Sequence, residues 1–341
     1  MTASRAPVRQ SSVRAHNLAL VLQTVANSTD RPSRAAIAAL TGLTRATVSA
    51  LVDDLIAGGL LTEHDPAPRT GAGRPAAGLA LNAGGPAGLG LEINVDYLAA
   101  CVVDLTGSVR HRIVAHGDQR PVSAADSLRA LDELAARARA AATAEGLTLA
   151  GAALAVPGLV TAAGLVRVAP NLGWQDVDVP ALLPGLAGLP LIVENEANLA
   201  ALASADGDRT FLYVSGEIGH VTVYPDGRPC RCGARGCLEQ YAGQEHVVAD
   251  AALAASALGI ALAAVVNLLD IGVIVLGGAY APEFDRLRGG IEAELGRRVL
   301  TSGLAPVTLR AAALGADAAM RGAADAVLQS VRDDPAAWLG R

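Results

Sequence analysis

The sequence predicts an α/β body with two lobes, preceded by a smaller α+β unit of three helices and two short strands. Three observations lead to this fold class. Apolar residues recur at helical spacing through the first part of the chain. The stretch NAGGPAG at 82–88 is rich in glycine and proline and is typical of a linker. Beyond it, strand-like and helix-like segments alternate, which indicates an α/β fold. We therefore expect domains at 1–82 and 88–341, joined by a linker at 83–87.

The composition fits a chain of more than one domain. Of its 341 residues 52% are hydrophobic but only 3% are aromatic, so alanine, leucine and valine must build the core. The net charge of −6 is unevenly spread, because residues 1–82 hold eight arginines and five acidic residues while the remainder holds 19 and 28. A basic front end on an acidic body indicates an attached nucleic-acid-binding module, although a local fluctuation in composition would give the same charge.

The first unit is predicted to contain a helix-turn-helix. Its first helix carries an apolar stripe, and Ser33 is placed to cap the second helix. A tight turn at Gly42 follows, Thr44 caps the third helix, and Gly58-Gly59 ends it. Two helices joined by such a turn are the helix-turn-helix pattern. The apolar positions expected to face inward are Leu18, Val21, Leu22, Val25, Val48, Leu51, Leu55 and Ile56.

The third helix is expected to read the major groove of double-stranded DNA through its first exposed positions. Arginine can grip guanine with two hydrogen bonds, and hydroxyl groups can reach base edges or phosphates, so Arg45, Thr47 and Ser49 suit this role. Residues 60–66 and 73–82 are predicted to form the two strands of a wing. Arg69 and Arg74, around the glycines of RTGAGRP, are placed to approach phosphates or the minor groove. The alternative is a small helical domain that binds another protein.

The body is predicted to begin with a hairpin. The expected elements, in chain order, are strands at 88–95, 98–107 and 108–116, a helix at 124–145, a strand at 151–158, a strand leading into a helix over 189–204, strands at 209–216, 219–227, 272–280 and 306–315, and a last helix. This alternation is the basis for the two-lobed α/β body.

Three of the four cysteines lie close together with a histidine. His220, Cys230, Cys232 and Cys237 offer one imidazole and three thiolates, a set that suits tetrahedral zinc without an open position for water. We expect a structural zinc site, because the C-x-C-x4-C spacing forces a compact loop in which Gly233 and Gly236 permit the turns. The alternative is a set of reduced thiols without metal. Cys101 lies in an apolar run and is expected to be buried.

Ala251–Leu269 is nearly all apolar and long enough to span a bilayer. Eight of its 19 residues are alanine, and no arginine lies between Arg235 and Arg286 to anchor it at a membrane surface. We therefore expect a buried helix. The N-terminus lacks the pattern of a secretory signal, so the protein is expected to be cytoplasmic with no membrane partner.

Six segments taken together resemble the ROK family of bacterial repressors and sugar kinases. They are VPGLV, APNLGW, VENEAN, GEIGH, CRCGARGCLEQ and VVNLLDIGVIVLGG. The resemblance covers about Gly88 to Gln329, and the first unit matches the winged helix of the family's repressors. It implies an actin-like, hexokinase-type fold with a sugar-binding cleft between two lobes, and a homodimer or homotetramer.

The nucleotide-binding elements of the family's kinases are altered in this chain. Those kinases carry an Asp-x-Gly-Gly-Thr loop, whereas this chain has Glu92 and then Asn94 and Val95, whose side chains obstruct phosphates. A second glycine-rich loop before GEIGH is missing, while the adenosine-side turn at Leu276–Gly278 persists. Glu196 stands in place of the catalytic Asp. We therefore expect no kinase activity.

The resemblance also implies a set of sugar contacts and zinc at the four cysteine and histidine positions. Amide and carboxylate groups suit a sugar because its hydroxyls both donate and accept hydrogen bonds. If zinc binds one ring nitrogen of His220, the other is fixed in direction and can hold a sugar hydroxyl. The implied sugar contacts are Asn171, Asn195, Glu196, Glu217, His220 and Glu239.

The sequence thus leads to a DNA-binding transcriptional regulator of sugar metabolism genes, most simply a repressor, with a sugar effector. One alternative is an ATP-dependent sugar kinase with an appended DNA-binding domain. Another is a binding or scaffold protein that keeps only the zinc-containing fold, or a repressor that acts without a sugar.

Overall fold

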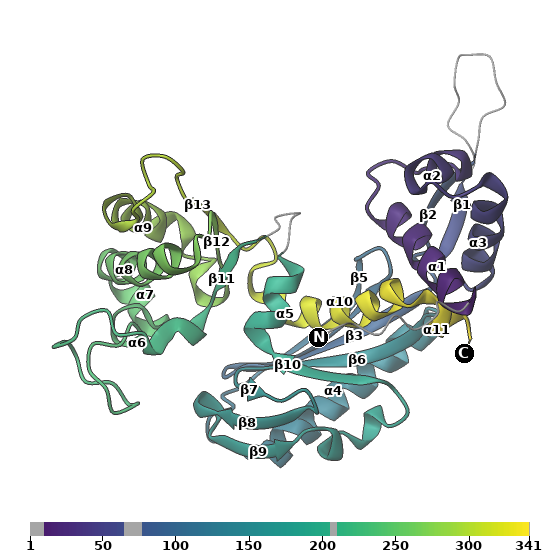
Figure 1. Cartoon of the computed structure of the whole chain (residues 1–341). Coiled ribbons are helices and arrows are strands. Elements are labelled where there is room, and N and C mark those ends of the chain that lie inside the picture. Colours follow the sequence, from purple (N-terminus) through teal and green to yellow (C-terminus); the bar gives the residue numbers. More distant parts are fainter. Residues whose placement is uncertain (1–9, 65–76, 205–209, 341) are drawn as a thin grey trace, which may run out of the picture. The chain divides into compact units, whose positions relative to one another are not determined.

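The computed structural model describes residues 10–64, 77–204 and 210–340. They form two compact units, of which unit 1 comprises Met1–Glu194 with Ala323–Arg341 and unit 2 comprises Asn195–Gly322. Each unit has a hydrophobic core of its own. The chain passes between the units twice, and the second passage lies inside helix α10 (Ala318–Asp333), labelled in Figure 1.

The N-terminal part of unit 1 is a winged helix-turn-helix, as predicted. Ser33 and Thr44 cap α2 and α3 by accepting hydrogen bonds from backbone amides of the first turn. Between the two helices Gly42 adopts a left-handed φ of 73°, and the chain bends by 117°, which is typical of this motif. The wing strands pair antiparallel. The elements are α1 (Gln10–Ala26), α2 (Arg34–Thr41), α3 (Arg45–Ala57), β1 (Leu61–His64) and β2 (Gly78–Leu81).

The predicted inward face of this unit is buried with one difference. Ile56 is only half-buried, while Val52 is fully buried. Val52 lies four residues after Val48 and three before Leu55, so it falls on the same side of the helix as both. The buried positions that were predicted are Leu18, Val21, Leu22, Val25, Val48, Leu51 and Leu55.

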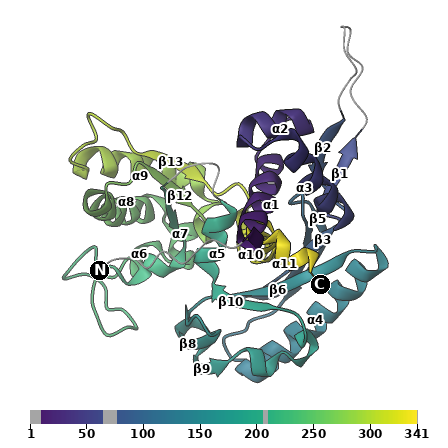
Figure 2. The ribbon, with the colours of Figure 1, turned by 45° about the vertical axis from the view of Figure 1, so that its right-hand side comes forward.

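The rest of unit 1 centres on a mixed sheet of strand order β10-β6-β3-β4-β5. Leu89 and Leu91 pack with α4 on one face, and Gly88, directly before Leu89, faces α10, where a Cβ would overlap the carbonyl oxygen of Ala324. Figure 2 shows the two helices on either side of the sheet. The elements are β3 (Pro86–Ile93), β4 (Tyr97–Asp104), β5 (Val109–His116), α4 (Ala124–Ala144), β6 (Thr148–Val156) and β10 (Leu191–Asn195).

The connection between the winged unit and this sheet is shorter than the predicted linker. Strand β3 begins at Pro86, and both Pro86 and Ala87 are buried. Residues predicted as linker therefore pair with β6, because a sheet edge offers their backbone groups hydrogen bonds that water would otherwise supply. Only residues 82–85 connect the two parts.

A second, antiparallel sheet in unit 1 was not among the predicted elements. It consists of β7 (Leu159–Val160), β8 (Leu165–Ala169) and β9 (Trp174–Asp178). Its strands are too short for a clear period-two pattern, which explains why the sequence does not signal them. A 3₁₀ turn at Pro170–Leu172 joins β8 to β9 and carries Asn171.

Unit 2 is built on a parallel sheet of order β11-β12-β13. The predicted buried helix is confirmed as α8, with the predicted bounds; it has the length and hydropathy of a membrane span, but half of that window is buried inside the protein. Helix α9 packs along it through close approaches at Gly259 and Gly290. The elements are α5 (Glu196–Ala203), β11 (Leu212–Val214), α6 (Glu239–Ala242), α7 (Gln244–Ala249), α8 (Ala251–Leu269), β12 (Val273–Leu276), α9 (Phe284–Arg298) and β13 (Thr308–Ala311).

The strand predicted at 219–227 is wrong. A 3₁₀ turn covers Gly216–His220, and residues 221–227 form an irregular loop with one isolated bridge between Thr222 and Cys237. The alternating valines resemble a strand, but the loop must fold back to bring its cysteines together. Tertiary contacts therefore override the local preference for strand.

Candidate metal centre, sugar contacts and recognition helix

The predicted metal ligands lie together in unit 2. The ligand atoms of His220, Cys230, Cys232 and Cys237 are all within 4.8 Å of one another. Cys230 Sγ is 3.7 Å from His220 Nδ1, and Cys232 Sγ is 3.6 Å from Cys237 Sγ. Ligands of a tetrahedral zinc, with Zn–S near 2.3 Å, lie about 3.8 Å apart, so this spacing fits such an ion. The group can hold a metal.

Glycine shapes the loop that carries these ligands. Gly236 has φ 70°, and a Cβ there would overlap the carbonyl oxygen of Tyr224. Gly233, with φ 92°, closes the turn between Cys230 and the following strand-like segment. The guanidinium carbon of Arg228 lies over the ring of Tyr241, 4.9 Å from its centroid, in a cation–π contact. The loop is thus fixed by backbone conformation and packing.

The thiols of the group have unequal proton affinity. Hydrogen bonding from the Cys232 backbone amide is the largest effect on Cys230 and lowers the pKa of its thiol to about 7. Burial raises the pKa of the Cys237 thiol to about 11, with its thiol neighbours adding to the shift. A cation would remove this difference, because metal-bound thiols are deprotonated.

Two of the implied sugar contacts lie next to the metal group. His220 turns Nδ1 toward Cys230, which leaves Nε2 on the opposite side of its exposed ring. The Glu239 carboxylate packs against Gly219, where a Cβ would overlap its Oε2 atom. Burial is the main cause that raises the pKa of the Tyr280 phenol, and the negative charge of the Glu239 carboxylate raises it further. Glu239 therefore lies beside the backbone of Gly219, the residue before His220.

Asn195 and Glu196 occupy the start of α5 in unit 2. Asn195 Oδ1 caps this helix by accepting hydrogen bonds from the amides of Ala197 and Asn198. Glu196, half-buried, is the first residue of the helix, where its negative charge is favoured by the helix dipole. The amide oxygen of Asn195 thus has a structural role that the sequence did not suggest.

The implied sugar contacts do not all belong to the same unit of the chain. Asn171 is exposed on the 3₁₀ turn of unit 1, whereas the other sugar positions belong to unit 2. Glu217 lies in the 3₁₀ turn at Gly216–His220, and its side chain is outside the described part of the structure, as are Arg69 and Arg74.

The loop that corresponds to the first phosphate loop is a tight turn closed by side chains. Asn94 N donates to Tyr97 O, and Val95 packs against the core of unit 1. Glu92 is 2% exposed, and Tyr97 donates its phenol proton to Glu92 Oε1 at 2.7 Å. The residues of this turn therefore contact one another and the core of unit 1. Tyr97 was not among the residues that the sequence singled out.

The adenosine-side turn is covered in a similar way. A Cβ at Gly277 would overlap the hydroxyl and ring carbons of Tyr213, and Gly278, with φ 51°, faces Ser215. The glycines after β12 therefore make room for side chains of the neighbouring strand β11. The sequence pattern alone does not distinguish this packing from a nucleotide contact.

The first turn of α3 presents a mostly small, polar surface. Arg45 is exposed, Ser49 is half-buried, and Thr47 shares a hydrogen bond of 2.9 Å with the Thr44 hydroxyl. Arg34 supports the helix from α2, donating to Ser49 O at 3.2 Å and to Asp53 at 2.7 Å. Arg34 had not been singled out, since its partners lie 15 and 19 residues away.

Comparison with known protein families gives a clear match. Residues 88–210 and 212–252 match the model of the ROK family. A xylose repressor from Caldicellulosiruptor bescii (strain ATCC BAA-1888 / DSM 6725 / KCTC 15123 / Z-1320) is 29% identical over 270 residues, which cover 68% of this chain and 65% of that protein. This chain thus matches less than two thirds of the relative's length.

Two solved structures show the same fold. A ROK family transcriptional regulator, described as a homolog of the Escherichia coli MLC protein, superposes with a TM-score of 0.76 at 20% identity and covers 96% of this chain and 100% of its own. The ROK hexokinase from Thermus thermophilus superposes with a TM-score of 0.57 at 28% identity, covering 72% of this chain and 99% of its own.

Proposed function

The chain belongs to the ROK family, and from this premise we propose that it is a sequence-specific DNA-binding transcriptional regulator, a repressor of sugar metabolism genes. In this proposal residues 1–82 bind the operator and residues 88–341 bind a sugar or sugar derivative as effector. The observation that carries it is the winged helix-turn-helix, with α2 and α3 each capped and α3 exposing Arg45. The relative named as a xylose repressor and the solved structure named as a transcriptional regulator support it.

The operator contacts that we propose are Arg45, Thr47 and Ser49 on α3, with Arg69 and Arg74 from the wing. The Thr44–Thr47 hydrogen bond orients the Thr47 hydroxyl at the first turn, where recognition helices meet base edges. A homodimer or homotetramer would present two such helices to a pseudo-palindromic operator. The relatives named as repressors support a cytoplasmic location.

The proposed effector contacts are Asn171, Asn195, Glu196, Glu217, His220 and Glu239. The position of the Glu239 carboxylate against the backbone of Gly219, next to His220 in the chain, supports this set. We further propose that His220, Cys230, Cys232 and Cys237 hold a structural zinc. Zinc would order the loop and fix the direction of His220 Nε2.

A sugar kinase is the second candidate, because the hexokinase from Thermus thermophilus shares the fold. Two features argue against it. The turn at Asn94 and Val95 carries side chains where the family's kinases have glycines, and the Tyr213 side chain lies on the backbone of Gly277, where a nucleotide would need close approach. We therefore infer that the chain is not an enzyme.

DNA binding is the direct test. Protection of genomic DNA fragments from nuclease should reveal a defined site for the native protein, and Arg45→Ala should weaken binding there by about ten-fold or more. Arg129→Ala removes an exposed arginine from α4, far along the chain from α3, and serves as the matched control. Protection without sequence preference would refute the regulator, and sugar-dependent release of ADP by the native protein would establish the kinase.

A further inference from the structure

The C-terminal end of the recognition helix is held by two hydrogen bonds from outside the winged unit's own helices. The carbonyl oxygen of Gly58 accepts a hydrogen bond of 3.0 Å from Trp338 Nε1, 280 residues away. The carbonyl oxygen of the next residue, Gly59, accepts one of 2.9 Å from Asn82 Nδ2. Two successive carbonyls directly after α3 are thus each bound by a different segment of the chain.

Close packing accompanies both hydrogen bonds. A Cβ at Gly58 would overlap the Leu339 side chain, and one at Gly85 would overlap the carbonyl oxygen of Gly59. Trp338 and Leu339 belong to α11 (Pro335–Leu339), and Asn82 and Gly85 to the connection at 82–85. Gly58 therefore does more than end the helix, because it admits α11, and Gly85 lets the connection approach the end of α3.

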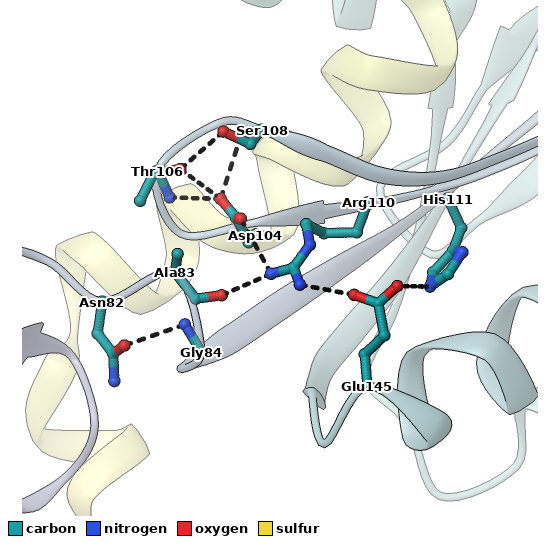
Figure 3. A network of polar contacts seen from close by, with 9 residues as sticks. All are labelled: Asn82, Ala83, Gly84, Asp104, Thr106, Ser108, Arg110, His111 and Glu145. Atoms are coloured by element: carbon teal, nitrogen blue, oxygen red, sulfur yellow. Dashed lines mark hydrogen bonds and ion pairs between the residues drawn. The ribbon is translucent and has the colours of Figure 1, made fainter.

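The connection itself is fixed to the sheet of unit 1, as Figure 3 shows. Arg110 Nη1 donates to the carbonyl oxygen of Ala83 at 3.0 Å and lies 3.4 Å from Asp104 Oδ2, while Nη2 pairs with Glu145 at 2.6 Å. Asp104 is only 1% exposed, and its other oxygen accepts hydrogen bonds from Thr106 and Ser108. This network gives the connection little freedom relative to β4 and β5.

The other segment, α11, continues from the helix that joins the two units. The boundary between unit 2 and unit 1 falls between Gly322 and Ala323, inside α10. At the far end of α10, Asp333 accepts hydrogen bonds from Gln329 at 2.7 Å and from Gln23 of α1 at 3.3 Å. The chain therefore leads from unit 2 to the winged unit through two consecutive helices, α10 and α11, separated by Asp334.

The space under α11 on the sheet side is incompletely filled. A cavity of about 260 Å³ lies between the helices and the β6–β10 edge, lined among others by Ala150, Pro190, Ile192, Val327, Ala337 and Trp338. Side chains that line this partly open pocket have fewer packing partners there, so α11 resists displacement less on that side. By contrast, the interaction of α11 with the end of α3 combines a hydrogen bond with close packing. A shift of α10 would thus carry α11, and with it the end of α3.

We propose that α11 and residues 82–85 form a two-point clamp on the C-terminal end of α3, which transmits displacement of α10 to the orientation of the recognition helix. The connection at 82–85 is the fixed point, held by Arg110, and α11 is the movable point. The clamp itself does not depend on the proposed function; only its effect on DNA binding does.

The first test measures whether the clamp orders the winged unit. Trp338→Phe removes the donor to Gly58 but keeps an aromatic ring, and Asn82→Asp removes the donor to Gly59 but keeps the oxygen that accepts from Gly84 N. Each should speed amide hydrogen exchange in α1–α3 about three- to ten-fold, the worth of one hydrogen bond. Trp174→Phe is the matched control, because its buried Nε1 has no hydrogen-bond partner among the described residues.

The second test measures transmission. A Cβ at Gly322 would overlap the backbone of Leu199, so Gly322→Ala should displace α10 within unit 2. It should change exchange in α1–α3 in the native background and not in Trp338→Phe. Gly296→Ala, on α9 with open space around it, should leave α1–α3 unchanged in both.

The clamp is wrong if both single variants exchange like the native protein, or if exchange rises equally in α4 and α1–α3. It is also wrong if Gly322→Ala acts the same with and without Trp338. These outcomes need no DNA. A native protein that protects no DNA sequence would instead refute the regulator, while the exchange results would still decide the clamp.

Discussion

Two tyrosines make side-chain contacts beside the turns predicted from the sequence to correspond to the nucleotide-binding elements of the family's kinases. Tyr97 donates to the buried Glu92, and Tyr213 covers Gly277. Neither residue belongs to a motif, and both act through contacts with a neighbouring strand.

Metal binding should depend on each of the four grouped residues, His220, Cys230, Cys232 and Cys237. Cys237→Ser should lower bound zinc to a small fraction of one ion per chain, as measured by elemental analysis after dialysis, because a closed structural site depends on all four ligands. Cys101→Ser, which alters the buried cysteine of β4, should keep its zinc. Equal zinc in native and Cys237→Ser protein would show that these residues do not hold the metal.

Zinc binding should also depend on pH. Burial raises the pKa of Cys237 to about 11 in the metal-free group, so its thiol must release a proton when metal binds. Apparent affinity should therefore fall as pH is lowered, and titration calorimetry in buffers of different ionisation enthalpy should detect the released protons. An affinity that does not change with pH would exclude thiolate ligation.

At the scale of elements, the pair α8–α9 depends on one buried carboxylate. Glu294 is 5% exposed and contacts Arg298, Ser256 and Arg297. The Arg298 hydrogen bond is the main cause that lowers the pKa of Glu294. A lowered pKa in the folded state contributes stability above the unfolded pKa near 4.3, and this stability is lost as pH falls through the folded value.

Glu294→Gln should therefore destabilise the protein by about 1–3 kcal/mol at pH 7 and by less below pH 4. Denaturation by urea at several pH values, followed by the exchange of α8 and α9 amides, measures this. Glu292→Gln, on the exposed side of α9 in a pair with Arg288, should cost less than about 0.5 kcal/mol. A pH-independent loss in Glu294→Gln would mean that packing, not charge, is responsible.

At the scale of the whole molecule, residues 1–82 carry a net positive charge and the remainder a net negative charge. Binding to DNA should weaken steeply as salt rises, because arginine contacts release counterions from phosphates. Arg45→Ala should reduce the slope of log affinity against log salt by about 1 if Arg45 meets a phosphate, and leave it unchanged if Arg45 reads a base. Measurement by fluorescence anisotropy at several salt concentrations distinguishes the two roles.

The sequence by itself determined the winged helix-turn-helix, the buried helix α8 and the grouping of His220 with three cysteines. These features rest on local signals: caps at Ser33 and Thr44, helical periodicity, and ligand spacing. Local signals work where an element is stabilised mainly by residues near in sequence.

Only the tertiary structure decided the loop at 219–227, the small sheet β7–β9 and the contact of Trp338 with Gly58. In each case the stabilising partner lies on another segment, so no periodicity or motif in the sequence predicts the contact. The same holds for Tyr213 and Gly277. The glycine resembles that of a nucleotide-binding turn, but in the folded chain the Tyr213 phenol lies against it. Which atoms occupy the space beside a backbone is set by packing, and packing is a property of the folded chain.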